Sequence, residues 1–174
     1  MEKVYIAKAL RTPIGSFGGT LSQQSAAQLG TCVLNELLKQ TALPASAIDE
    51  VLVGSALQAG QGQNVARQIA LNAGLDWQVP ATTINMVCGS GMRAILNGIQ
   101  SIMVGDNQIV IAGGSESMSN APYLQKNVRF GAKMGQVSLE DSLLYDGLED
   151  AFSHQHMGLT AETLADQYNL TRAK

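Results

Sequence analysis

The stretch INMVCGSGMRA, residues 84–94, indicates most clearly how this chain folds. It joins a short strand-like run, residues 82–86, to a long apolar pattern with helical spacing over residues 90–104. Gly89 and Gly91 remove side chains that would crowd the turn, and Ser90 is a suitable N-cap for the helix. The stretch therefore predicts a tight strand–turn–helix connection with Cys88 in the turn.

The same alternation of strand and helix patterns continues on both sides of this turn. Strand-like runs and helical patterns occupy, in chain order, residues 4–9, 25–40, 51–53, 64–72 and 108–112. Such alternation is typical of a mostly parallel sheet with helices on both faces, so we predict an α/β fold. The helix over residues 90–104 is apolar almost all round, which predicts that it is buried.

The composition and the periodicity of the sequence change after Gly114. Residues 115–150 mix glycine, serine and charged residues without a clear period, and a further helical pattern covers residues 160–168. We predict a first domain over residues 1–118, incomplete because its last strand is missing, and the start of a loop-rich second module over residues 119–174. Because domains seldom end on an unfinished pattern, we expect the chain to be the N-terminal part of a longer protein.

Composition and charge exclude several classes of function. The chain has 174 residues, a formal net charge of −3, and 45% hydrophobic against 14% charged residues. It has no basic stripe interleaved with aromatic residues, as nucleic-acid binding requires, and no apolar run long enough to span a bilayer. Its two cysteines allow neither a disulfide framework nor a zinc quartet. We therefore expect a cytoplasmic protein that binds neither nucleic acid nor membrane.

Cys88 is the candidate nucleophile. At a helix N-terminus a thiol faces unpaired N–H groups and the positive end of the helix dipole, and both favour the reactive thiolate. The alternative is that Cys88 is a small buried hydrophobic residue, as most lone cysteines are. The glycine-rich turn alone leaves both interpretations open, since flavodoxin-like turns also use glycines. Cys32 lies in the middle of a helical pattern with no glycine turn beside it, so we predict that it is a core residue.

Four motifs give the chain its resemblance to a known family. NMVCGSGMRAI (85–95) is similar to the nucleophile motif of the thiolases, and AGGSESMSNAPY (112–123) to the segment that follows their catalytic sheet. RTPIGSFGG (11–19) and HMGLTAE (156–162) match further thiolase motifs in the same order, so the resemblance covers essentially the whole chain. The detail around the cysteine is more like the biosynthetic acetoacetyl-CoA thiolases than the degradative 3-ketoacyl-CoA thiolases. The β-ketoacyl-ACP synthases carry their cysteine in a different, serine-rich context.

The resemblance implies an activity and a set of site residues. Thiolases catalyse the reversible Claisen condensation of two acetyl-CoA molecules to acetoacetyl-CoA and CoA, with no metal or prosthetic group. Cys88 maps onto the nucleophile that takes the acyl group. Leu148 matches a pantetheine-contacting position, and His156 and Met157 match residues at the floor of the acyl and pantetheine site. For His156, the alternative is a histidine packed in a loop.

The resemblance also implies what this chain lacks. In the family, an activating histidine, a second cysteine and an asparagine of the oxyanion hole come from later segments, so we expect this chain alone to be inactive. Residues 123–135 resemble the loop that joins dimers into tetramers, which implies a homotetramer, a dimer of dimers, for the complete protein. A different possibility is a non-catalytic half that assembles with a partner chain carrying the missing groups.

Overall fold

The computed structural model describes residues 3–173, and the chain divides into two compact units. The first unit ends at Asn120 and the second begins at Ala121. This division lies two residues beyond the domain boundary that the sequence predicts between residues 118 and 119. The first unit contains Cys88, and the second contains Leu148, His156 and Met157.

The first unit is built on a three-stranded parallel sheet in the order β2-β1-β3. The strands are β1 (Glu50–Gly54), β2 (Ala81–Ile84) and β3 (Val110–Gly114). Gly54 at the end of β1 pairs with Ile84 on one side and with Gly114 on the other, so the three strands end level with one another. In open parallel sheets this carboxyl edge is where ligands usually bind.

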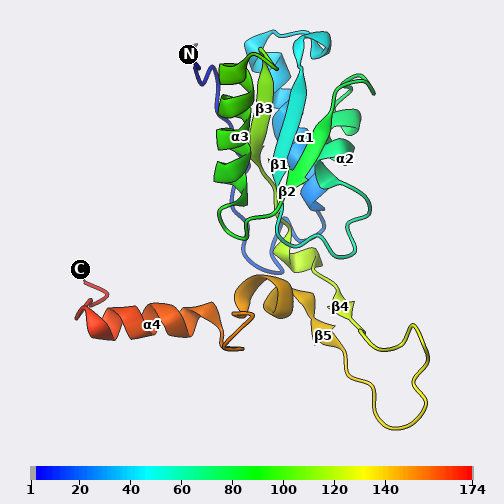
Figure 1. Cartoon of the computed structure of the whole chain (residues 1–174), viewed down its shortest axis with the longest axis vertical. Helices are drawn as coiled ribbons and strands as arrows, with labels where there is room; N and C mark the ends of the chain where they lie inside the picture. Colours follow the sequence, from blue (N-terminus) through cyan, green and yellow to red (C-terminus); the bar gives the residue numbers. More distant parts are fainter. Residues whose placement is uncertain (1–2, 174) are drawn as a thin grey trace. The chain divides into compact units, whose positions relative to one another are not determined.

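Three helices cover the two faces of this sheet (Figure 1). They are α1 (Ala26–Thr41), α2 (Val65–Asn72) and α3 (Ser90–Val104), with α3 on one face and the other two on the opposite face. Val51 and Val53 of β1 belong to the buried cluster formed with α1 and α2. The predicted α/β fold, a parallel sheet with helices on both faces, is confirmed.

Side-chain caps explain where two of these helices begin. Ser25 Oγ accepts a hydrogen bond from the backbone N–H of Gln28 at 3.1 Å, and Gln28 Oε1 accepts one from the N–H of Ser25 at 2.8 Å, which forms a capping box at α1. Asn64 caps α2 by accepting from the N–H of Arg67 at 3.0 Å. The helices that the sequence predicts over residues 25–40 and 64–72 are therefore confirmed, with ends that agree to within one residue.

Two expectations for the helices and strands of the first unit are wrong. Residues 4–9 form no strand, because a strand needs a hydrogen-bonding partner and none pairs with them within residues 3–173; Tyr5 and Ile6 are 78% and 75% exposed. The helix α3 is not buried all round. It rests on the sheet through Ser90, Ala94 and Gly98, while Met92 on its outer side is 69% exposed.

The second unit consists of a short hairpin, a helical turn and a helix. The strands β4 (Tyr123–Leu124) and β5 (Glu140–Asp141) pair antiparallel, and a long loop over residues 125–139 connects them. A π-helical turn, η3 (Leu144–Leu148), follows, and α4 (Met157–Gln167) is the last helix of the unit. The sequence places the start of this last helix at residue 160, three residues too late. Within residues 3–173, no helix is both long and apolar enough to cross a membrane.

Candidate active site

Cys88 lies in the turn that joins β2 to α3, at the carboxyl edge of the parallel sheet. Its side chain is exposed. The interpretation of Cys88 as a buried hydrophobic residue is therefore wrong for this chain, and its role as nucleophile stays a prediction.

Hydrogen bonds between residues three or four apart in sequence close the turn around Cys88. The backbone N–H of Gly89 donates to the carbonyl of Met86 at 3.0 Å, and that of Ser90 donates to the carbonyl of Val87 at 3.1 Å. Ser90 Oγ accepts from the N–H of Met86 at 2.8 Å and donates to the carbonyl of Val87 at 2.5 Å. The prediction that Ser90 is the N-cap of α3 is wrong, because Gly89 takes that position and Ser90 is the first helical residue. Its hydroxyl braces the turn instead.

The backbone conformation of the turn is unusual at the residue before the cysteine. Val87 has a φ of 49°, in the left-handed region that β-branched residues rarely adopt. Strained backbone of this kind persists only where the surroundings hold it, and it often occurs at functional sites. The next residue is Cys88, whose side chain is exposed.

Close backbone packing fixes the start of α3 against the sheet. A Cβ atom placed on Gly54 would lie 2.3 Å from the carbonyl carbon of Ser90 and 2.4 Å from the backbone nitrogen of Gly91. A Cβ on Gly91 would be 3.6 Å from the Cα of Gly114. The first turn of α3 therefore lies directly on the ends of β1 and β3, where only a glycine at position 54 permits the approach.

The chemistry available at this turn comes from the backbone. No side chain caps α3, and the N–H of Ser90 is already bonded to Val87, so the N–H groups that follow Ser90 in the first turn are the ones that can face negative charge near Cys88. An exposed thiol beside a helix N-terminus suits nucleophilic attack on an electrophilic carbonyl. Deprotonating a carbon next to a thioester needs more, namely a positioned base and an oxyanion site.

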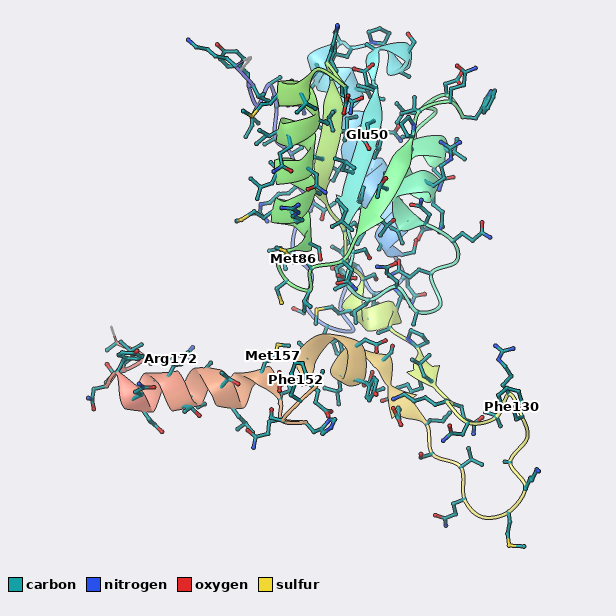
Figure 2. All side chains as sticks on the ribbon, viewed as in Figure 1. Glu50, Met86, Phe130, Phe152, Met157 and Arg172 are labelled. Atoms are coloured by element: carbon teal, nitrogen blue, oxygen red, sulfur yellow. The ribbon has the colours of Figure 1, made fainter. Side chains whose placement is uncertain are left out.

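The structure gathers the three predicted substrate-lining residues in the second unit. Leu148 ends η3, and the next residue, Glu149, forms an antiparallel bridge with His156. Leu148 is half-buried and His156 is exposed. Met157, labelled at the start of α4 in Figure 2, is 38% exposed. Cys88 belongs to the other unit, so its combination with these three residues stays a prediction.

His156 is held by its own helix. Its Nδ1 accepts a hydrogen bond from the backbone N–H of Gly158 at 3.0 Å and so caps α4. In the neutral ring, this bond leaves the proton on Nε2, which can donate to a ligand. The cap also explains why α4 begins at Met157, ahead of the predicted start.

Two polar residues close to the Cys88 turn were missed by the sequence reasoning. Asn85 bonds the backbone of the turn, and Glu116 bonds backbone N–H groups of the loop that follows β1. Each comes one or two residues after the end of a strand, Ile84 for Asn85 and Gly114 for Glu116. That position at the carboxyl edge is the signal that could have identified both.

Cys32 is exposed, so its prediction as a core residue is wrong. The buried side of α1 carries Ala26, Ala27 and Leu34. Cys32 lies in a shallow surface groove with Glu36 and Lys39 on the same helix. The helical spacing placed Cys32 beside apolar neighbours in sequence, but it lies away from them around the helix axis.

Comparisons with known proteins agree with the geometry of the first unit. Residues 4–174 match the family profile described as "Thiolase, N-terminal domain". Proteins named "Probable acetyl-CoA acyltransferase" from Staphylococcus aureus (strain COL) and Staphylococcus epidermidis (strain ATCC 12228 / FDA PCI 1200) are 52% and 51% identical over 172 residues. In both cases the match covers 99% of this chain and 44% of the relative.

A solved structure is also similar. The Acat5 thiolase from Ascaris suum, in complex with coenzyme A, superposes with a TM-score of 0.89 at 47% sequence identity. The match covers 94% of this chain and 42% of that protein. The chain thus spans less than half the length of the relatives that it matches.

Proposed function

The chain belongs to the thiolase family, and we propose that it supplies the acyl-accepting cysteine of an acetyl-CoA acetyltransferase. The observation that carries the proposal is the placement of Cys88: exposed, in a strained turn, at the N-terminus of α3 and at the carboxyl edge of a parallel sheet. This placement leaves the thiol exposed to a substrate beside a helix N-terminus, as a nucleophilic cysteine requires.

The proposed reaction has two halves. The thiolate of Cys88 attacks the carbonyl carbon of acetyl-CoA, the bond from that carbon to the CoA sulfur breaks, and CoA leaves as the acetyl group passes to Cys88. A base then removes an α-proton from a second acetyl-CoA, and the resulting carbanion attacks the acetyl carbonyl on Cys88. A carbon–carbon bond forms, Cys88 leaves as thiolate, and acetoacetyl-CoA is released.

The substrate class is supported by the relatives. The Staphylococcus proteins are named acetyl-CoA acyltransferases, and the Ascaris thiolase was solved with coenzyme A. We place Leu148, His156 and Met157 along the acyl and pantetheine part of the substrate, with His156 Nε2–H as a possible donor to a carbonyl oxygen. The proposal involves no metal and no prosthetic group.

The second half-reaction needs groups that this chain does not supply. In the proposal, the base, the second cysteine and the oxyanion asparagine come from the remainder of the family's length. By the full-length enzyme we mean this chain followed by that remainder. Residues 1–174 alone are expected to be inactive in condensation.

A dimer of dimers is the assembly that we propose for the full-length enzyme. The loop over residues 125–139 supports it, because this loop, on which Figure 2 labels Phe130, exposes 89% of Phe130 and 97% of Met134. Large exposed apolar side chains on a projecting loop are common at protein interfaces. Replacing both residues with serine should lower the molar mass in light scattering from that of a tetramer to that of a dimer.

A cytoplasmic location also remains a prediction.

Mass spectrometry after incubation with acetyl-CoA tests the proposed function. The full-length enzyme should gain one acetyl group on the peptide that contains Cys88 and release one CoA for each acetyl group. The Cys88→Ala variant should gain none, and the matched control Cys32→Ser should be acetylated like the wild type. If an active preparation carries no acetyl group on Cys88, the nucleophile is another residue.

Two further measurements separate the alternatives. A reading frame that continues past Lys174 into the missing histidine and cysteine motifs would exclude an assembly subunit, whereas a stop codon together with a co-purifying partner chain would support one. Rates with acetyl-CoA, longer acyl-CoA substrates and acyl carrier protein distinguish an acetyltransferase from a degradative thiolase and from a synthase.

A further inference from the structure

We propose that Asn85 and Glu116 are positioning residues that hold the strained turn of Cys88 through one shared contact, the peptide groups of Ala56. This inference deepens the proposed function and rests on it for its catalytic consequence. Neither residue reaches the substrate in the proposal. Both fix the position of the Cys88 thiol and restrict the turn to one conformation.

Asn85 connects the Cys88 turn to the loop that follows β1 at the carboxyl edge of the sheet. Its Oδ1 accepts a hydrogen bond from the backbone N–H of Val87 at 2.9 Å, which is the residue with the left-handed φ of 49°. Its Nδ2 donates to the carbonyl of Ala56 at 3.3 Å. Within residues 3–173, this is the one side-chain hydrogen bond that ties residues 85–90 to another segment of the chain. The other bonds that involve side chains of the turn stay inside it.

Glu116 holds the segment to which Asn85 is tied. Its Oε2 accepts from the N–H of Ala56 at 2.8 Å, and its Oε1 accepts from the N–H of Leu57 at 3.1 Å. Ser55 Oγ donates to the same Oε1 at 3.4 Å. A carboxylate that accepts several backbone N–H groups fixes a loop more firmly than a neutral acceptor does. With its N–H held, Ala56 presents its carbonyl to Asn85.

The backbone segment that carries Glu116 is itself anchored to the sheet. Ser115 donates its N–H to the carbonyl of Gly54 at 3.0 Å and its hydroxyl to the carbonyl of Ala26 at 2.7 Å. On the other side, Ser117 Oγ donates to the carbonyl of Gln24 at 2.7 Å. Residues 115–117 are therefore tied to β1 and to the start of α1.

The contacts form a line across the carboxyl edge of the sheet. It runs from the end of β3 through Glu116 to the loop after β1, and from Ala56 through Asn85 to the turn after β2. Because β1, β2 and β3 end level, short side chains suffice to span these loops. A left-handed valine relaxes unless its neighbours hold it, so loss of either link should let the Cys88 turn sample other conformations.

Four variants of the full-length enzyme test this inference: Asn85→Ala, Glu116→Ala, the double variant and Asn107→Ala. The last is the matched control, because Asn107 also ties segments of the first unit, donating to Glu50 Oε2 at 2.8 Å and to Ser101 Oγ at 3.1 Å, without bonding the turn, Ala56 or the residues that anchor Glu116. For each variant we would measure the acetylation rate of Cys88, the KM for acetyl-CoA, the alkylation rate of Cys88 by iodoacetamide and the midpoint of thermal unfolding.

The expected result is a loss of rate that exceeds any loss of stability. Each single variant should acetylate Cys88 about 10- to 100-fold more slowly, since a misplacement near 1 Å has effects of this size. The KM should change by less than about threefold, because the substrate contacts remain. Alkylation should fall in parallel. Because both residues act through Ala56, the double variant should lose no more than the slower single variant does.

Several outcomes would overturn the inference. One is a rate loss no larger than that of Asn107→Ala at an equal loss of thermal stability, which would mean a merely structural role. Another is a double variant whose loss is the product of the two single losses, which would mean independent effects. Alkylation needs no substrate, so it decides the inference even if wild-type Cys88 takes no acetyl group. A wild type that is alkylated but never acetylated refutes the proposed function alone.

Discussion

Replacing Gly54 with alanine should displace the turn that carries Cys88. The added Cβ would lie 2.3 Å from the carbonyl carbon of Ser90 and 2.4 Å from the nitrogen of Gly91, both backbone atoms that cannot rotate away. Real Cβ atoms essentially never approach other heavy atoms closer than 3.0 Å, so β1 and the start of α3 must separate by about 0.7 Å.

The size of the effect follows from that displacement. Overpacking of this kind costs about 1–3 kcal/mol of folding stability. A shift of nearly 1 Å at a reacting group lowers rates by up to about 100-fold, so we expect acetylation of Cys88 to slow by roughly 10- to 100-fold. Single-turnover release of CoA from acetyl-CoA measures the rate in the full-length enzyme, and thermal unfolding measures the stability.

Two other glycines at the same edge make a graded series. A Cβ on Gly114 would lie 3.2 Å from the Cα of Gly91, a tight contact that a small adjustment can relieve, and a Cβ on Gly113 would meet no atom within 4 Å. We expect Gly114→Ala to have an intermediate effect and Gly113→Ala to resemble the wild type. The steric argument fails if Gly54→Ala acetylates at the wild-type rate, or if Gly113→Ala loses as much as Gly54→Ala does.

Three further predictions concern the scaffold around the site. The backbone N–H groups of Ile109 and Gln108 donate to the Asp49 carboxylate and hold its pKa below its ordinary value. The carboxylate therefore stabilises the fold above about pH 4, and this contribution disappears as the pH falls through the lowered pKa. Asp49→Ala should therefore lower the free energy of unfolding by about 1 kcal/mol at pH 7, and the difference from the wild type in urea titrations should shrink towards pH 3, whereas a constant difference would contradict the assignment. Ser25→Ala removes the capping box with Gln28 and should cost about 1 kcal/mol in the same titrations, with Ser25→Asp restoring most of it. Cys32 is exposed but lies outside the proposed site, so maleimide should label it equally with and without acetyl-CoA, whereas acetyl-CoA should protect Cys88.

The glycines and helical periods of this sequence predict the layered fold because they act locally. Gly89 and Gly91 indicate the turn, and the spacing of apolar residues indicates α1, α2 and α3. The strand predicted over residues 4–9 illustrates the limit, because an apolar run becomes a strand only where a partner is present, and the pattern of one segment contains no information about its partner.

The candidate site was predictable only in part for a similar reason. Cys88 can be identified from its residue type and from the glycine turn around it, and the family motif supports the same assignment. The left-handed Val87 and the hydrogen bonds of Asn85 and Glu116 depend on loops that are far apart in sequence, 60 residues in the case of Glu116 and Ala56. Ordinary polar residues acquire such roles only once the strand ends have been brought level.

The level ends of β1, β2 and β3 also determine where this scaffold can accommodate change. Deleting one residue within any of these strands would shift its following loop by about 3.3 Å and reverse which side chains face each layer of helices. Insertions, affinity tags and fluorescent labels therefore belong at the opposite edge, in the connections over residues 42–49, 73–80 and 105–109 that lead from a helix into a strand. Natural length variation among relatives should be concentrated in the same three connections, so the carboxyl edge should keep its spacing while the amino edge varies.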